Sequence, residues 1–417
     1  MLKDYLTAEQ SGEEVSSVVN AVRGGIPSAV FGVSFAEKCH VSSAFDLPLL
    51  YVAKDSLYAA KVVEELKGLT GEDVVFLPAK DDVLLYKTAF DKSRFYERLS
   101  AVYKIQHGAK YVVATFESLL QLFPKNLPSV EIKRGQTLDP YKLASELMKF
   151  GYKREEFAEE RASFALRGDI FEIYPVNGND IYRVDFFGDE IETITRYDGG
   201  NKEEKTIIGG FTAIAATDAI IEEKDRDEIK ERLRASVLKF KTLVVKDDAR
   251  RIAAEISEKI DDGGTSDVFQ FILPILPSVT DDITSFMPKD TVVVYDECKM
   301  LSDSLSAIIK EHTERVLTLS RAGRAMDFTI LQLSDSNKLI ERLNKFRRVA
   351  VQNITTAVNF FNPLKTFNVK CSPLARYSAK PDDLFRDVSN WKFSGYRIIL
   401  CCGNETRAEK MAETAKI

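Results

Sequence analysis

The chain has 417 residues, of which 45% are hydrophobic and 29% are charged, with a formal net charge of −6. This composition is typical of a globular protein, and the length predicts two to four domains. The longest apolar runs fall short of the roughly 18 residues that a membrane-spanning helix needs, and the acidic balance favours protein partners over strong duplex-DNA binding, a local basic patch aside.

The first 125 residues alternate short apolar runs with amphipathic stretches. Such alternation is typical of an α/β fold, a parallel sheet with helices on its faces. The predicted strands are 27–32, 48–53, 74–77 and 111–114, and the predicted helices are 56–66 and 92–105. Asp139, a good N-cap residue, and Pro140 then begin a further helix, which Gly151 ends.

A β-rich segment follows, up to about residue 205. Its three apolar runs predict a three-stranded meander. Asn177-Gly178, a dipeptide that accepts positive φ, is expected to form the first tight turn, and Gly188-Asp189 the second. The predicted strands are 169–174, 181–187 and 190–197.

From about residue 209 the chain becomes helical and charged. Glu222 and Arg226, like Glu228 and Arg232, are spaced i,i+4 and predict ion pairs on one solvated helix. Another helix is predicted at 250–260. The β/α alternation resumes with a buried strand at 291–295 and continues to about residue 378.

The last 40 residues are predicted to begin a new unit after a linker at Lys380-Pro381. Helix, strand and helix are expected at 382–391, 396–402 and 406–415. Three such elements cannot bury a core by themselves. We therefore expect residues 380–417 to be the beginning of a further small α/β domain, in an N-terminal fragment of a longer protein, or else to dock elsewhere.

Three side chains of the β-rich segment are predicted to share one exposed face. Arg183 and Phe187 lie four residues apart on one strand, so the two-residue period puts them on the same side. Arg167 joins them if the strand register pairs odd positions with odd ones. Arginine and aromatic residues dominate binding hot spots. The pattern leaves one alternative open, in which Phe187 is buried and the arginines are merely solvated.

The same segment resembles a known module. The runs LRGDIFEIYP and YRVDFFGDEIE closely resemble, in sequence and in order, the module shared by the excision-repair protein UvrB and the transcription-repair coupling factor Mfd. In that family the module docks the protein UvrA. The resemblance covers residues 1–375 with decreasing specificity away from the meander. It implies that Arg167, Arg183 and Phe187 are the UvrA-binding residues.

The stretch FGVSFAEKCH resembles a degenerate nucleotide loop of that family, whose pattern is GVTGxGKT. Gly32 and Lys38 remain, but Phe35 and Glu37 replace glycines and Cys39 replaces Ser/Thr. The glycines normally let backbone N–H groups wrap a phosphate, and the hydroxyl holds Mg²⁺. Phe35 obstructs that wrap, Glu37 repels phosphate, and Cys39 is a poor ligand for a hard cation. We expect this loop to bind no nucleotide.

Asp296 and Glu297 follow the predicted strand TVVVY and resemble a degenerate Walker B motif. Without a phosphate cradle opposite them, we expect no metal there. Lys38 is expected to be an ordinary helix-start lysine. We assign no catalysis to the three histidines, which are scattered in sequence: His40, His107 and His312.

The resemblance implies a domain plan. A degenerate P-loop, helicase-like α/β domain is built from residues 1–126 and 209–376, with the α+β UvrA-docking domain, 127–208, inserted between them. The chain is then expected to be the N-terminal region of a bacterial transcription-repair coupling factor. In that family, motor domains that use ATP and Mg²⁺ lie beyond residue 417 and push stalled RNA polymerase off DNA.

This plan also implies partners. The region is expected to recruit UvrA, to be no enzyme itself and to need no cofactor. The family buries the docking surface against its own C-terminal domain until activation. RNA polymerase and DNA are reached through other domains, and no membrane is involved.

Two rival functions differ in what they require. A UvrB-like excinuclease subunit needs an intact nucleotide loop, against which Phe35, Glu37 and Cys39 argue. A stand-alone α/β enzyme would use Asp296 and Glu297 as acid and base, but adjacent side chains at a strand end tend to diverge.

Cysteine usage and the start of the chain bear on the compartment. An odd count without metal-ligand spacing favours a reducing cytoplasm and no structural disulfides. The first residues lack the apolar stretch of a signal peptide. The cysteines are Cys39, Cys298, Cys371, Cys401 and Cys402, the last two in an expected buried strand.

Overall fold

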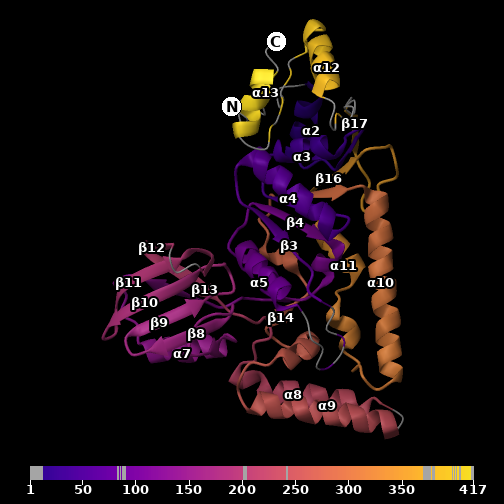
Figure 1. Ribbon diagram of the computed structural model, residues 1–417. Helices are drawn as coiled ribbons and strands as arrows, with labels where there is room; N and C mark the ends of the chain where they lie inside the picture. The colour runs from indigo at the N-terminus through magenta and orange to yellow at the C-terminus, as the bar shows by residue number, and fades with distance from the viewer. Residues whose placement is uncertain are drawn as a thin grey trace. The chain divides into compact units, whose positions relative to one another are not determined.

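A seven-stranded parallel sheet forms the centre of residues 13–369 (Figure 1). The computed structural model describes residues 13–81, 84, 86, 91–200, 204–240, 243–369, 377, 381–396, 398, 400, 402 and 405–414. The strand order is β17-β1-β16-β15-β2-β4-β3, and each neighbouring pair runs parallel. The strands are β1 Ser28–Phe31, β2 Leu49–Ala53, β3 Val74–Leu77, β4 Tyr111–Thr115, β15 Val292–Asp296, β16 Arg347–Gln352 and β17 Lys365–Asn368. Two distant stretches of the chain, 28–115 and 292–368, therefore share one sheet, as the family resemblance implies.

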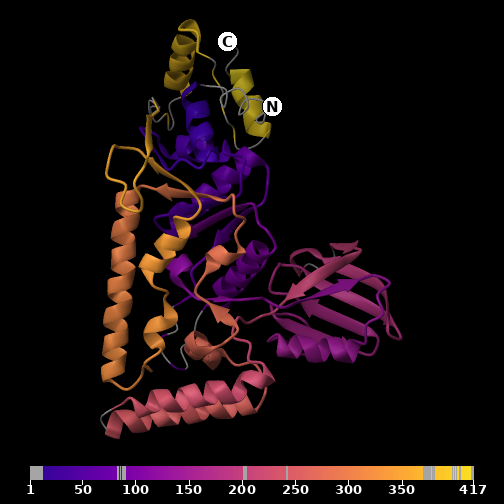
Figure 2. The same cartoon turned by 180° about the vertical axis from the view of Figure 1, so that it is seen from behind.

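Alternate residues of these strands enter two cores on opposite faces of the sheet. On β2, Leu50 and Val52 belong to one core, and Leu49 and Tyr51 belong to the other. The Tyr51 side is covered by α2 Glu13–Arg23, α3 Phe35–Ser43 and α4 Ser56–Thr70. The Leu50 side is covered by α5 Lys92–Gln106, α6 Phe116–Leu120, α10 Cys298–Arg321 and α11 Ser336–Leu343. Figure 2 shows α10 from behind as one continuous long helix.

Residues 153–214 build a second, mixed β-sheet domain. Its main sheet has six strands in the order β12-β11-β10-β9-β8-β7. The predicted meander is present as β9, β10 and β11, and the sheet has three further strands that the sequence pattern did not predict. Only β7 and β8 pair in parallel. The strands are β7 Lys153–Arg154, β8 Ser163–Arg167, β9 Ile170–Tyr174, β10 Ile181–Phe187, β11 Glu190–Tyr197 and β12 Lys205–Ile207.

One face of this sheet packs on helix α7 (Pro140–Lys149) and on the ribbon of β6 (Ser129–Lys133) and β13 (Gly210–Ile214). The Asp139 carboxylate caps α7 by accepting the N–H groups of Tyr141 and Lys142, and Gly151 follows the helix with φ 92°, as predicted. The shared core contains large apolar side chains from every layer: Leu143, Phe164, Phe171, Val184, Ile194 and Ile214.

The two predicted turns of the sheet have different outcomes. Gly188 has φ 61° and joins β10 directly to β11, as predicted. The expected tight turn at Asn177-Gly178 is wrong, because neither residue has positive φ and the connection runs from 175 to 180. Asn177 instead donates its side-chain amide to the carbonyl of Thr212 at 2.9 Å, which ties the loop to β13.

Helices α8 (Arg226–Leu238) and α9 (Leu243–Asp261) lie side by side as an antiparallel pair (Figures 1 and 2). The predicted pair of Glu228 and Arg232 is present at 2.6 Å. The predicted pair of Glu222 and Arg226 is wrong, because α8 begins only at Arg226 and Glu222 contacts Lys224 instead. Smaller elements lie elsewhere in residues 13–369: β5 Phe123–Pro124, β14 Val279–Thr280, η1 Asp198–Gly200, η2 Glu223–Asp225, η3 Asp267–Ile275, η4 Ile283–Phe286 and η5 Thr329–Gln332.

Residues 371–417 form a separate unit with two described helices, α12 Pro381–Phe393 and α13 Glu405–Thr414. The predicted buried strand at 396–402 is wrong for its described residues, 396, 398, 400 and 402, none of which is in a strand or buried. Its other residues, including Cys401, lie outside the described part of the chain, and so do Cys371 and Lys380. No helix in the described part of the chain combines the length and apolarity that crossing a membrane requires.

Candidate docking face and degenerate nucleotide loop

The strand register brings the three predicted docking residues to one face of the six-stranded sheet. Arg183 on β10 lies opposite Glu172 on β9, and Asp185 lies opposite Ile170. Ile170 in turn lies opposite Arg167, the last residue of β8. Because residues opposite one another point to the same side of a sheet, Arg167, Arg183 and Phe187 share the face that is turned away from the core. Arg167 reaches this face from a strand that the sequence pattern missed.

Phe187 is an exposed aromatic side chain at the end of β10. It is 80% exposed, whereas its neighbours Val184 and Phe186 are buried in the core. The alternative in which Phe187 belongs to the core is therefore wrong. The backbone of Phe187 is held in a strand next to a tight turn, so its apolar side chain projects from a defined position among polar residues.

Both arginines of this face are held by carboxylates of the same sheet. The guanidinium of Arg183 contacts Asp185 at 2.8 Å, and this hydrogen bond raises the pKa of Arg183. Arg167 donates to Glu172 at 2.6 Å, and its guanidinium lies 4.5 Å from the centre of the Phe157 ring. Each side chain is more than one-third exposed, 38% for Arg167 and 36% for Arg183. Both guanidinium groups are therefore held in place and still accessible, which suits bidentate recognition of a partner's carboxylate or carbonyl groups.

The degenerate nucleotide loop joins β1 to α3. Gly32 has φ 79°, and a Cβ there would come within 2.5 Å of the Val369 carbonyl oxygen, so packing alone explains this glycine. Phe35 is the first residue of α3 and packs edge-on against Tyr58, with 5.3 Å between the ring centres. The Ser34 hydroxyl donates to the Glu37 carboxylate in the first turn. A helix N-terminus attracts anions, and here the first turn already carries the negative charge of Glu37.

Lys38 is buried between the two carboxylates of the Walker B-like pair. Its Nζ lies 2.7 Å from Asp296 and 2.5 Å from Glu297, and its side chain is 4% exposed. The predicted role of Lys38 as an ordinary helix-start lysine is therefore wrong. The other oxygen of Asp296 accepts a hydrogen bond from Tyr51 at 2.6 Å, and burial together with Asp296 raises the pKa of Tyr51.

The backbone of Glu297 fixes its carboxylate in this network. Glu297 has φ 55°, a left-handed conformation that costs a non-glycine residue free energy. Its carboxylate also accepts the backbone N–H of Asn353 at 2.8 Å. Lys38 thus has both of its carboxylate partners within the protein, and the arrangement can tie the two halves of the parallel sheet together.

Cys39 and Cys298 lie next to Lys38 and Glu297 in the sequence, and we expect their thiols to be unreactive. Both are buried, and burial raises the pKa of each thiol, that of Cys298 to about 12. In the described residues, His, Cys, Asp and Glu side chains form no group of three that could hold a metal ion. His40, His107 and His312 lie on or beside different helices.

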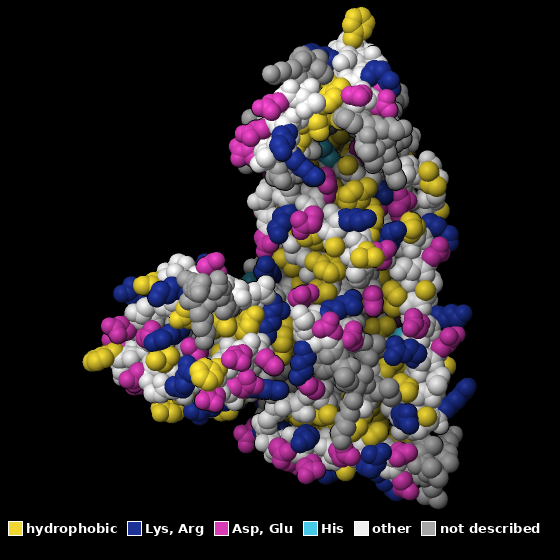
Figure 3. Space-filling model, viewed as in Figure 1, with side chains coloured by type: hydrophobic (Ala, Val, Ile, Leu, Met, Phe, Trp, Pro, Cys, Tyr) yellow, Lys and Arg dark blue, Asp and Glu magenta, His cyan; other side chains and the backbone are white. Residues whose placement is uncertain are grey.

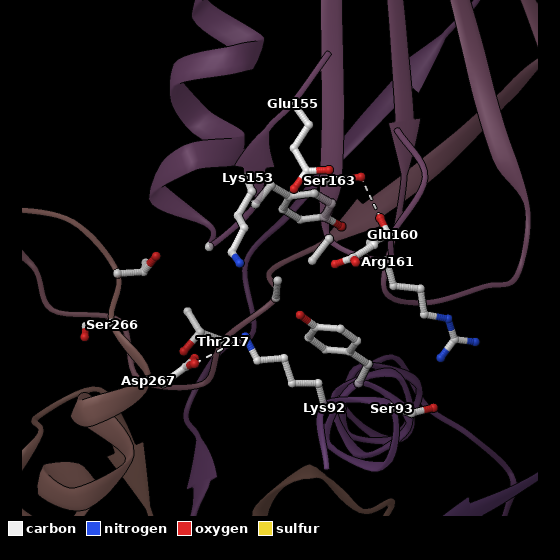
Figure 4. Close-up of a pocket in the computed structure, with 16 residues that line it drawn as sticks. Lys92, Ser93, Lys153, Glu155, Glu160, Arg161, Ser163, Thr217, Ser266 and Asp267 are labelled. Atoms are coloured by element: carbon white, nitrogen blue, oxygen red, sulfur yellow. Dashed lines mark hydrogen bonds and ion pairs between the residues drawn. The ribbon is translucent and has the colours of Figure 1, made fainter. Parts of the chain in front are cut away.

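A separate cavity of about 480 Å³ lies between the N-terminal end of α5, the β7–β8 region and residues 265–267. Figure 4 shows Lys92 and Lys153 reaching into it from opposite sides, with Arg161 directed away. Lys92 contacts Asp267 at 3.2 Å. Because Glu155 and Glu160 also line it, the cavity offers both signs of charge and selects no single class of charged ligand.

Comparison with known proteins gives two findings. Residues 130–218 match the family model described as the UvrB interaction domain, which includes the whole docking face. The chain is 21% identical, over 97% of its length and 35% of the relative's, to a transcription-repair-coupling factor of Bacillus subtilis (strain 168). A protein of the same name from Myxococcus xanthus is 22% identical over 96% of this chain and 35% of its own length, and one from Staphylococcus aureus (strain bovine RF122 / ET3-1) is 22% identical over 87% and 32%. The chain spans about a third of the length of these curated relatives.

Proposed function

We propose, since this chain is a homologue of the N-terminal region of transcription-repair-coupling factors, that its six-stranded sheet is a docking module for UvrA. One observation carries the proposal. The three residues that the family resemblance assigns to UvrA binding, Arg167, Arg183 and Phe187, lie on one exposed face within the matched UvrB interaction domain.

The chemistry of the face suits a protein partner with an apolar recess and acidic or carbonyl groups around it. Phe187 supplies apolar area that becomes buried on binding, which is favourable because apolar surface leaves water. Arg183 and Arg167 supply directional, charge-assisted hydrogen bonds. Lysine at position 183 restores only part of the affinity, because it keeps the charge and loses the planar fork.

The test compares two arginines of the same sheet. Arg183 and Arg196 are each 36% exposed, and each contacts the aspartate two residues later. Arg196 lies opposite Tyr182, which packs toward the core, so it occupies the other face. Arg183→Ala weakens binding to purified UvrA by about 2 kcal/mol, whereas Arg196→Ala leaves it unchanged. Both variants keep their stability within about 0.5 kcal/mol. Equal binding by the two variants would show that this face does not dock UvrA.

We further propose that the β1–α3 loop binds no nucleotide and that this region of the protein is no enzyme. Phe35 lies where the helix N-terminus would receive a phosphate, and Lys38 is already neutralised by Asp296 and Glu297. The same burial argues against a stand-alone enzyme that uses the two carboxylates, since Asp296 is 1% exposed. A UvrB-like excinuclease subunit would need a glycine-lined phosphate cradle. The cavity of about 250 Å³ at this loop is lined instead by Phe35, Lys38, Asp296 and Glu297, among others.

The whole protein, on this proposal, works in the cytoplasm as a transcription-repair coupling factor. ATP-driven motor domains outside this chain release RNA polymerase stalled at DNA lesions, and the docking module recruits UvrA to the site. A C-terminal domain of the same protein covers the docking face until activation. Removing that domain from the full-length protein would then raise the affinity for UvrA without any change in residues 1–417.

A further inference from the structure

The Arg167 guanidinium is held on two sides. One of its nitrogens donates to the Glu172 carboxylate at 2.6 Å, and its carbon lies over the Phe157 ring, 4.5 Å from the ring centre. Phe157 lies in the loop between β7 and β8, outside the strands that carry the docking residues. The hydrogen bond and the ring contact together restrict the conformations open to the Arg167 side chain.

Glu172 occupies the middle of the docking face although it is itself almost inaccessible. It lies directly opposite Arg183 on β10 and Ala165 on β8, and diagonally from Arg167. Its side chain is only 9% exposed, whereas those of the two arginines are more than one-third exposed. A carboxylate at this depth is stabilised by its cationic neighbours. Because it is covered, Glu172 is a poor direct contact for a partner protein.

We propose that Glu172 and Phe157 are positioning residues of the docking face, which hold Arg167 in the orientation that UvrA binds. The proposal rests on the proposed UvrA docking function. A long, exposed arginine normally loses rotamer freedom when it binds a partner. Here the free protein already restricts that freedom, so less is lost on association. Phe157 adds its own exposed ring edge beside the fork, being 43% exposed.

The test measures the affinity for purified UvrA in two backgrounds, the unaltered chain and Arg167→Ala. Glu172→Gln keeps the shape of the side chain and removes its charge, and Phe157→Leu keeps apolar contact and removes the π face. In the unaltered chain each substitution weakens binding about fivefold, the effect expected from freeing one long side chain. In the Arg167→Ala background neither substitution has a further effect, because the side chain that they position is absent.

Two further measurements separate the outcomes. Glu192→Gln, which removes an exposed carboxylate from the neighbouring strand β11, leaves binding unchanged and controls for the loss of one negative charge. Thermal melts identify any variant that lowers affinity by unfolding, and the exposed Phe157 provides a test even if Glu172→Gln is unstable.

The docking function and the positioning role fail in different ways. If Arg167→Ala and Arg183→Ala both bind as the unaltered chain does, the docking function is wrong. If Arg167→Ala weakens binding while Glu172→Gln and Phe157→Leu do not, the positioning role is wrong and the docking function stands. Equal losses in both backgrounds also contradict the positioning role, because they would show an effect that does not pass through Arg167.

Discussion

Replacing Lys38 by methionine removes the charge at the centre of the former nucleotide loop and keeps most of the side-chain volume. Asp296 then stays buried at 1% exposure, without a cationic partner, and keeps the hydroxyls of Tyr51 and Tyr58 as side-chain donors. Glu297 is less affected, because it is 20% exposed and keeps the Asn353 N–H. Removing one partner of a buried ion pair costs about 3 to 5 kcal/mol. We therefore expect Lys38→Met to lower the free energy of unfolding by that amount at neutral pH.

Lys104→Met is the matched control for this substitution. Lys104 and Asp73 are also 2.7 Å apart, but their side chains are 49% and 59% exposed, so the loss is at most about 1 kcal/mol. Tyr51→Phe removes one hydrogen bond to the buried carboxylate of Asp296. Its loss of unfolding free energy, about 2 kcal/mol, lies between those of the two lysine variants. Urea denaturation followed by circular dichroism ranks the three variants. If Lys38→Met is no more destabilising than Lys104→Met, the buried network does not hold the two halves of the sheet together.

Three further outcomes are expected. Calorimetry detects no ATP binding with or without Mg²⁺, and micromolar ATP binding by the unmodified chain would overturn this prediction. The triple variant Phe35→Gly, Glu37→Gly, Cys39→Thr does not hydrolyse ATP either, because a motor needs more than a phosphate cradle. Double-stranded DNA binds weakly and dissociates at about 150 mM salt, because acidic and basic side chains are interspersed over the face seen in Figure 3; a sub-micromolar dissociation constant at that salt would reveal a basic surface elsewhere. Alkylation at pH 8, read by mass spectrometry, leaves Cys39 and Cys298 unmodified in the native protein, because burial raises the pKa of each thiol and pH 8 lies far below the value of about 12 for Cys298; rapid labelling of either would show that the core around β15 opens.

The strands of the meander, where 181–187 and 190–197 coincide with β10 and β11, and the first strands of the parallel sheet were the most predictable parts of the fold. Strands that are buried on both faces appear in the sequence as continuous apolar runs, and the predicted strand at 74–77 coincides with β3 while that at 48–53 differs from β2 by one residue. The turn at Asn177-Gly178 was not predictable from its dipeptide, because a tertiary hydrogen bond to Thr212 sets the loop. Strand β8 was not predicted because its sequence, SFALR, includes the small residues Ser163 and Ala165, which give no strong strand pattern.

The exposed residues of the docking face could be predicted from the sequence, but the residues that hold them in place could not. Strand parity places Arg183 and Phe187 together from sequence alone, since the period of two needs no tertiary information. The roles of Glu172 and Phe157 depend on strand register and on the course of a loop, neither of which their local sequence specifies. Lys38 was misjudged for a similar reason, because its partner Asp296 lies 258 residues away along the chain.

A photo-crosslinking group at position 187 tests the docking face most directly. Phe187 is 80% exposed, so a benzoylphenylalanine in its place fits without disturbing the core. Tyr141 on α7, 69% exposed and on a different element, provides the control position. On irradiation with purified UvrA, the group at 187 forms a covalent adduct and the group at 141 does not. An adduct from 141 without one from 187, or none from either in a mixture where UvrA is bound, would contradict the assignment of this face to UvrA.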